Sequence, residues 1–258
     1  MWRWMLCWCV VMLAAVSSHA EPLRVLFVGN SYTAYFNLPG QVQAMCDHAG
    51  IDAQIEMTTA GGKSWQWHFE QGKAPGRIAE GDWDVVVLQE YSRGALDKPE
   101  AFDTYGEKMI ELVQSIGAKP VLYLTWARQH LPEDQDTITG KYAALAQRTG
   151  AGVAPVGAAW QDWFAEHPDS ELHRKDRSHP NRQGTYLAAC VMFATITGQS
   201  PVGQVHRIRG RDVVEKTDIL ADLPADEAAL LQQRAWDTVS AFDLAEAAAK
   251  SPGEAATP

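Results

Sequence analysis

Basic residues are in deficit in this chain. Its 258 residues include 22 lysines and arginines against 32 aspartates and glutamates, which gives a formal net charge of -10. Nucleic acids and anionic membranes attract proteins that carry basic surfaces, and this sequence provides no such excess. We therefore expect neither nucleic acid nor an anionic membrane surface as a partner.

Apolar runs long enough to cross a membrane are also absent. The longest apolar stretch near the start, residues 5–16, is too short to span a bilayer and follows the basic Arg3. It ends near Ser18-His-Ala20, a small-x-small sequence typical of a cleavage site before Glu21. We interpret residues 1–20 as a signal peptide. The mature protein is then expected in the periplasm or secreted, with no stable membrane insertion after cleavage.

Cysteine is scarce, and two of the four cysteines, Cys7 and Cys9, fall within the expected signal peptide. The remaining Cys46 and Cys190 could form a disulfide in an oxidising compartment. Both lie in apolar helical segments, where a free thiol packs as a small core residue. We expect them to be unpaired and buried.

Motifs for metals and nucleotides are lacking as well. The sequence contains no His-Glu-x-x-His and no paired Cys-x-x-Cys, and we expect His167 and His173 to be surface or loop residues. Gly61-Gly-Lys-Ser64 resembles the end of a nucleotide-binding loop, but the first glycine of that motif would fall on Met57. We therefore predict no metal, no nucleotide and no cofactor.

Strand-like and helix-like segments alternate along the rest of the chain. Strands are expected at residues 23–28, 53–58, 84–88, 120–125 and 152–156, and helices at 39–49, 100–116, 134–148, 158–166, 180–197 and 225–249. We expect a loop at 59–73, an irregular or weakly stranded segment at 202–217 and a disordered tail at 251–258. The alternation predicts a single α/β domain over residues 21–250, with helices on both faces of a parallel sheet.

Ser31 comes shortly after the first expected strand, in the sequence Gly29-Asn-Ser31, at the sheet edge where functional residues collect. That pattern alone leaves open whether Ser31 is a nucleophile or the cap of a helix. Asp176-Arg-Ser-His179 favours the nucleophile. An aspartate three residues before a histidine can accept the Nδ1–H of the ring, which leaves Nε2 to take a proton from serine.

These segments together resemble the SGNH hydrolases, also called GDSL-like lipases and esterases. The resemblance covers residues 23–201, and four ordered blocks carry it: Val28–Tyr32, Gly61–Ser64, Val87–Glu90, and Asp176–Pro180 with its continuation to Leu187. It implies a three-layer α/β/α sandwich around a mainly parallel, five-stranded sheet of the flavodoxin-like type.

The resemblance also implies roles for individual residues. Ser31 would attack an ester carbonyl, His179 would act as general base and then general acid, and Asp176 would orient the histidine.

An oxyanion hole would complete this site. The resemblance implies three donors: the N–H of Ser31, the N–H of Gly62 and the side-chain amide of Gln89. The choice of Gly62 over Gly61 is open. SGNH hydrolases usually have asparagine where this chain has Gln89, so we place the chain in a divergent branch of the superfamily.

Aromatic and basic residues follow the expected strands close to this site. We assign them to substrate binding, although each aromatic could instead pack in the core: Tyr32, Trp65, His68, Trp126 and Arg128.

The sequence thus predicts an exported serine esterase that hydrolyses carboxylic esters through an acyl-enzyme. Acetyl or other acyl esters of carbohydrates lead as substrates, with lipid esters as rivals. Two alternatives stay open: a non-catalytic carbohydrate-binding module on the same fold, and an acyltransferase that uses the same triad. The sequence leaves the oligomeric state open.

Overall fold

The computed structural model describes residues 21–250, so the expected signal peptide and C-terminal tail lie outside the described residues. Five strands form one sheet: β1 (Leu23–Gly29), β2 (Ala53–Thr59), β3 (Val85–Leu88), β4 (Lys119–Tyr123) and β5 (Gly152–Ala154). They lie in the order β2-β1-β3-β4-β5, and every pairing is parallel. In a sheet of this order the connections diverge at β1 and β3, which places a functional site at their carboxyl ends.

The central strands are buried on both faces, as their continuous apolar sequences predict. Because successive side chains of a strand point to opposite faces, Val25 and Phe27 join one core cluster, whereas Leu26 and Val28 join another. The alternation along β1 therefore divides the core into two apolar layers, one on each face of the sheet.

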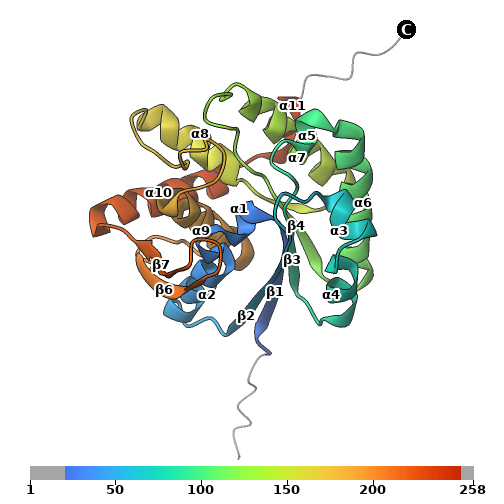
Figure 1. Cartoon of the computed structure of the whole chain (residues 1–258), viewed down its shortest axis with the longest axis horizontal. Helices are drawn as coiled ribbons and strands as arrows, with labels where there is room; N and C mark the ends of the chain where they lie inside the picture. Colours follow the sequence, from blue (N-terminus) through green and yellow to red (C-terminus); the bar gives the residue numbers. More distant parts are fainter. Residues whose placement is uncertain (1–20, 251–258) are drawn as a thin grey trace, which may run out of the picture.

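Helices cover both layers, and none of those formed by residues 21–250 has the length and apolarity of a membrane span. The longer ones are α2 (Leu38–His48), α6 (Pro99–Ser115), α7 (Asp134–Thr149), α8 (Val156–Glu166), α9 (Arg182–Thr197) and α10 (Ala225–Ala241). Figure 1 shows α2, α9 and α10 on one side of the sheet and α6 on the other. The predicted three-layer α/β/α sandwich is confirmed.

Short helices connect these elements, one of them where the sequence predicted a loop. They are α1 (Ser31–Ala34), the 3-10 helix η1 (Tyr35–Asn37), α3 (Trp65–Glu70), α4 (Ala74–Glu80), α5 (Gly94–Asp97) and α11 (Leu244–Ala249). The expected loop at residues 59–73 thus contains α3, because the Ser64 hydroxyl accepts the Trp67 N–H and caps a helix. The loop expectation was wrong for this part.

Two predicted helix boundaries were also wrong. The expected helix over 225–249 breaks after Ala241, and Asp243 caps the separate α11 through the N–H groups of Ala245 and Glu246. The expected helical start at Pro180 is instead a bridge that pairs this residue with a strand-like position in the preceding loop. Helix α9 begins only at Arg182.

The segment expected to be irregular or weakly stranded forms an antiparallel hairpin of β6 (Arg207–Asp212) and β7 (Thr217–Asp222). The buried Asp212 carboxylate accepts N–H groups from Phe36 at 3.1 Å and Val214 at 2.9 Å. The hairpin is thereby fastened to the chain that follows α1.

Cys46 on α2 and Cys190 on α9 are both free and buried, as expected. Burial raises the pKa of the Cys46 thiol to about 11, so this thiol is protonated at neutral pH.

Candidate active site

Ser31 lies at the carboxyl end of β1, at a sharp turn into α1. The preceding Asn30 accepts the Tyr32 N–H through its side chain at 3.1 Å and so caps this short helix. Gly29 is required before the turn, because a Cβ there would lie 2.5 Å from the Thr33 hydroxyl. The turn leaves the Ser31 side chain partly exposed, and its N–H makes no hydrogen bond within residues 21–250.

The side chains of Ser31, His179 and Asp176 meet in one chain of hydrogen bonds. The Ser31 Oγ lies 2.9 Å from the His179 Nε2, and the His179 Nδ1 lies 2.7 Å from the Asp176 Oδ2. The carboxylate accepts the Nδ1–H, which leaves the Nε2 lone pair facing the serine hydroxyl. The structure therefore brings together the three residues that the sequence predicted as a triad.

The Asp176 carboxyl is held in its ionised form, in which it accepts hydrogen bonds. Partial burial raises the pKa of its carboxyl, but the hydrogen bonds from the His179 ring and from the N–H groups of Ser178 and His179 outweigh this effect. The net pKa lies below the ordinary value, so Asp176 is ionised near neutral pH.

The loop that carries Asp176 and His179 is closed by its own backbone. The Arg174 N–H donates to the His179 carbonyl at 2.8 Å, and the Arg177 N–H donates to the Arg174 carbonyl at 2.9 Å. Arg177 adopts a left-handed conformation, with a φ of 61°. These contacts fix the short spacing between carboxylate and imidazole, and the Gln129 N–H adds a bond to the Arg177 carbonyl at 3.0 Å. We call residues 174–179 the triad loop.

Stacked aromatic rings support the triad loop from below. The rings of Tyr32 and Trp126 stack at a centroid distance of 4.6 Å, and those of Trp126 and Trp160 at 4.0 Å. The Tyr32 hydroxyl lies 2.7 Å from the Ser178 hydroxyl, and the Trp126 indole N–H donates to the Ser178 carbonyl at 3.0 Å. The stacked rings thus fix the position of Ser178, the residue next to His179.

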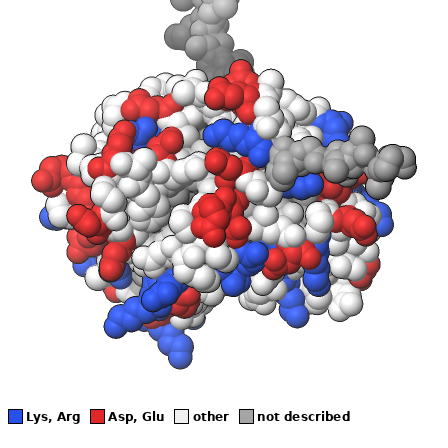
Figure 2. Space-filling view, turned by 90° about the horizontal axis from the view of Figure 1, so that it is seen from above, with Lys and Arg blue, Asp and Glu red and all other residues white. Residues whose placement is uncertain are grey.

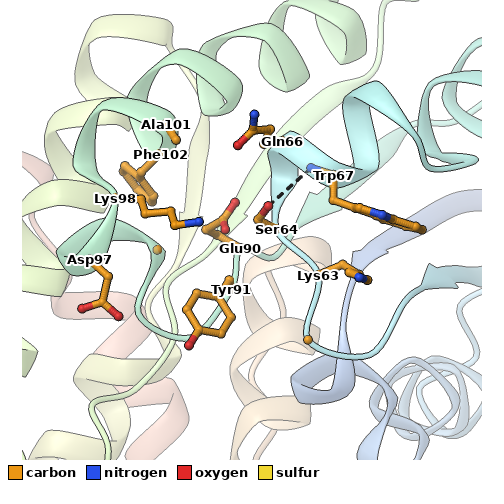
Figure 3. Close-up of a pocket in the computed structure, with 12 residues that line it drawn as sticks. Lys63, Ser64, Gln66, Trp67, Glu90, Tyr91, Asp97, Lys98, Ala101 and Phe102 are labelled. Atoms are coloured by element: carbon orange, nitrogen blue, oxygen red, sulfur yellow. Dashed lines mark hydrogen bonds between the residues drawn. The ribbon is translucent and has the colours of Figure 1, made fainter.

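Two cavities open at the same edge of the sheet. The first, which we call the loop cavity, has a volume of about 410 Å³ and lies between the β2–α3 and β3–α5 loops (Figure 3). The second, which we call the aromatic cavity, has a volume of about 520 Å³ and is bounded by Trp126, Trp160 and Phe164.

A comparison of the sequence with protein-family models finds no match, and a comparison with curated proteins finds none either. Solved structures do match. A candidate SGNH hydrolase from Slackia heliotrinireducens superposes with a TM-score of 0.61 at 27% identity, over 68% of this chain and 100% of that one. The chain has the SGNH-hydrolase fold.

Two further structures extend the comparison. A DUF4886 family protein from Bacteroides uniformis matches with a TM-score of 0.63 at 18% identity, over 86% of this chain and 96% of that one. A carbohydrate esterase family 3 protein from Talaromyces cellulolyticus matches with a TM-score of 0.58 at 12% identity, over 68% and 97% of the two chains. At such identities the likeness concerns the fold alone.

Gln89 does not occupy the position that the SGNH resemblance implied. Its side chain is fully buried, and its carbonyl oxygen accepts the Asn30 N–H at 2.8 Å and the Thr33 hydroxyl at 3.1 Å. Its amide nitrogen donates to the main-chain carbonyl of Glu90. Gln89 therefore holds the turn before the nucleophile, and its predicted role as an oxyanion donor is wrong in this geometry.

Gly62 lies at the exposed tip of the β2–α3 loop, in a turn closed by the Lys63 N–H and the Ala60 carbonyl at 3.1 Å. Its φ of 66° is left-handed, which explains a glycine here, whereas Gly61 has no such conformation. The Asn30 side chain donates to the Lys63 carbonyl at 3.0 Å and so fastens this loop beside Ser31. Donation by Gly62 to an oxyanion stays a prediction.

The residues predicted to bind substrate are mostly buried. Trp65 packs fully buried against Phe102, and the buried His68 donates its Nε2–H to the Gly29 carbonyl at 2.8 Å, so the predictions for both were wrong. Tyr32 and Trp126 are likewise buried beneath the triad loop.

Arg128 is half-buried and lines the aromatic cavity, so its assignment to substrate binding stays a prediction. His173, expected at the surface or in a loop, is instead buried against Trp160.

Sequence reasoning missed three residues near the site. The centroid of the half-exposed Tyr35 ring lies 4.7 Å from that of the His179 ring. The Ser178 hydroxyl forms a hydrogen bond with the Tyr32 hydroxyl. Glu90, a buried acid, lines the loop cavity. An acid two residues after a buried apolar strand was the available signal for Glu90. The contacts of Tyr35 and Ser178 depend on the fold and left no such signal.

The face of the molecule seen from above, over the carboxyl ends of the strands, carries acidic and basic side chains interspersed around uncharged areas (Figure 2). Within residues 21–250, no group of three or more histidine, cysteine or acidic side chains is arranged to hold a metal ion.

Proposed function

We propose that this protein is a serine esterase that hydrolyses carboxylic esters through an acyl-enzyme. The observation that carries the proposal is the continuous contact from Ser31 to His179 and from His179 to Asp176, at 2.9 Å and 2.7 Å. These distances are those of hydrogen bonds between a nucleophile, its base and the group that orients the base.

In the proposed reaction, the Ser31 Oγ attacks the ester carbonyl carbon while the His179 Nε2 takes the hydroxyl proton. The ionised Asp176 stabilises the imidazolium that forms. Collapse of the tetrahedral intermediate breaks the bond to the alcohol oxygen, which receives the proton from His179. Water then attacks the acyl-Ser31 with His179 again as base, and the acid leaves as Ser31 recovers its proton.

The negative oxygen of both intermediates needs hydrogen-bond donors. The N–H of Ser31 is free of other hydrogen bonds within residues 21–250, and the N–H of Gly62 is the proposed partner. One such donor is worth roughly 10²–10³ in rate. With Gln89 committed to the turn, we propose that the two backbone groups carry this role.

We propose carbohydrate esters, acetyl esters among them, as substrates in the periplasm or outside the cell. The signal-like sequence over residues 1–20 supports export. A structural neighbour described as a carbohydrate esterase supports the substrate class by analogy of fold.

The proposal is tested with p-nitrophenyl acetate. In Ser31→Ala we expect kcat to fall by a factor on the order of 10⁴ or more, because the nucleophile and its activation are both lost. Ser115→Ala, at an exposed position on α6, is the matched control and retains full activity. A fluorophosphonate should label Ser31, as identified by peptide mapping.

Three results would contradict this function. They are no hydrolysis of any short-chain ester, hydrolysis that survives in Ser31→Ala, and labelling at another residue. Retained binding of sugars without turnover would identify a carbohydrate-binding module instead. An acyltransferase would be revealed if added sugar acceptors divert the acyl group from free acid to a new ester.

A further inference from the structure

The loop cavity contains polar side chains that the proposed reaction does not use. Its two walls are the β2–α3 and β3–α5 loops, and the Asn30 side chain links them by donating to the carbonyls of Lys63 at 3.0 Å and Glu90 at 3.4 Å. Asn30 directly precedes Ser31. Both walls of the cavity are therefore bonded to the residue that precedes the proposed nucleophile, although Ser31 itself does not line the cavity.

A buried acid and a lysine without an ionic partner face this cavity. Glu90 is 3% exposed, and its carboxylate accepts the Trp65 N–H at 2.6 Å. Figure 3 shows the Lys98 side chain reaching toward the Glu90 carboxyl. Lys98 makes no ion pair within residues 21–250. Together the two groups offer a carboxyl acceptor and a charged ammonium donor side by side.

Two partly exposed aromatic residues, Trp67 on α3 and Tyr91 on the β3–α5 loop, are among the residues that line the cavity. Figure 3 shows the Trp67 ring directed away from Glu90 and Lys98, on the side of Lys63, whose ammonium lies 5.4 Å from the ring centroid, so Tyr91 is the ring nearer to the two charged groups. An aromatic face packs well against the C–H face of a sugar ring. The hydroxyl edge of the same ring needs donors and acceptors, which Glu90 and Lys98 provide.

We propose that the loop cavity binds the alcohol half of the ester as a pyranose ring. Glu90 and Lys98 bond to adjacent hydroxyl groups, and Tyr91 packs against one face of the ring. The inference rests on the proposed esterase function, whose nucleophile directly follows Asn30. The volume of about 410 Å³ lies within the range of roughly 300–1,000 Å³ typical of small-molecule sites.

Other occupants fit the cavity less well. A fatty acyl chain would offer no hydrogen-bond partner to the Lys98 ammonium, and it would leave Glu90 with the Trp65 N–H alone. An anion would meet the Glu90 carboxyl at the cavity floor. Asp97 at the rim is neutralised by Arg93, at 3.1 Å, and does not change this balance. An uncharged polyol satisfies both the acceptor and the donor.

The first test compares a mono-acetylated methyl pyranoside with p-nitrophenyl acetate, which has no sugar. In Lys98→Met we expect the ratio of kcat/KM for the two substrates to fall about tenfold to a hundredfold, because a hydrogen bond from a charged donor is lost. Lys119→Met is the matched control, since Lys119 is exposed at the start of β4 on the opposite edge of the sheet. It leaves the ratio unchanged.

A second pair of variants tests the aromatic wall. We expect Tyr91→Ala to raise KM for the sugar ester and Tyr91→Phe to restore most of the affinity, because a ring face is retained. A merely structural role for Tyr91 would instead change thermal stability and both substrates equally. Glu90→Gln keeps an acceptor oxygen for the Trp65 N–H and should raise KM for the sugar ester alone.

Direct binding separates this inference from the proposed function. Nuclear magnetic resonance titration of Ser31→Ala with methyl pyranosides should show binding, and Lys98→Met in that background should abolish it. If aryl ester is hydrolysed through Ser31 but the ratio and the sugar binding are unaffected by Lys98→Met, the cavity proposal is overturned while the esterase stands. If no ester is hydrolysed yet sugars bind through Lys98, the esterase fails and the sugar site stands.

Discussion

The loop cavity and the aromatic cavity are of similar size but differ in the side chains that line them. The first, of about 410 Å³, contains charged and hydroxyl side chains on two loops. The second, of about 520 Å³, is bounded by tryptophan and phenylalanine rings that belong to or pack on the main core. The charged and hydroxyl side chains of the loop cavity therefore belong to the protein surface. The rings that bound the aromatic cavity belong to the protein interior.

Each cavity also contains one buried titratable group, and burial disfavours the charge of both. It raises the pKa of Glu90 to about 7 and lowers the pKa of His173 below its ordinary value. An acid and a base neutralised by the same cause respond oppositely to pH. The two cavities can therefore be told apart by stability measurements as well as by kinetics.

The largest expected effect is a difference in the free energy of unfolding between variants of the aromatic cavity and of the loop cavity. Trp160→Ala should lower the free energy of unfolding by about 3–5 kcal/mol, because this ring is fully buried in the stack under the triad loop. Trp67→Ala should cost less than about 1 kcal/mol, since its ring is partly exposed. Urea unfolding measures both. Equal losses would show that the loop cavity is also part of the core.

A second measurement uses Glu90. Its pKa of about 7 in the fold, against an ordinary 4.5, favours the protonated form. The resulting stability is complete below pH 4.5 and is lost as pH rises through 7, by about 3 kcal/mol in total. Glu90→Gln has no proton to lose, so its stability relative to the unmodified protein should increase from pH 5 to pH 8. Parallel pH profiles of the two proteins would contradict this.

The smallest effect concerns His173, which donates its Nε2–H to the Ala127 carbonyl at 3.1 Å. Because its pKa is lowered in the fold, stability is complete above the ordinary 6.5 and is lost as pH falls through the folded-state pKa. His173→Gln should flatten the loss of stability between pH 7 and pH 5. The His173 contribution to stability thus falls as pH falls, whereas the Glu90 contribution falls as pH rises. If both contributions changed with pH in the same direction, the contrast between the cavities would be wrong.

The sequence was sufficient for the strands and for the triad, for definite physical reasons. Uninterrupted apolar runs such as Val85–Leu88 predict strands covered on both faces, and the order of such strands predicts the edge at which Ser31 lies. Asp176 and His179 are close in the chain, so their contact needs only a local turn.

Side-chain exposure could not be predicted in the same way. Trp65 and Trp126 follow strands just as binding residues do, but their burial is decided by Phe102 and Trp160, which come from distant helices. Gln89 has the chemistry of an oxyanion donor, yet the Asn30 N–H and the Thr33 hydroxyl occupy its carbonyl, and its amide nitrogen is bonded to the Glu90 carbonyl. The burial and hydrogen bonds of these side chains depend on residues that are distant in the sequence, so no local sequence pattern predicts them.

The spacing of the triad has a consequence for the order of assembly. Asp176 and His179 are separated by 3 positions, whereas Ser31 and His179 are separated by 148. Closing a long segment costs more chain entropy than forming a local turn. We expect the imidazole–carboxylate pair to form early in refolding, and the serine to arrive only when β1 is paired and α9 has docked. Regain of reactivity toward a fluorophosphonate would then mark the final long-range closure of the chain.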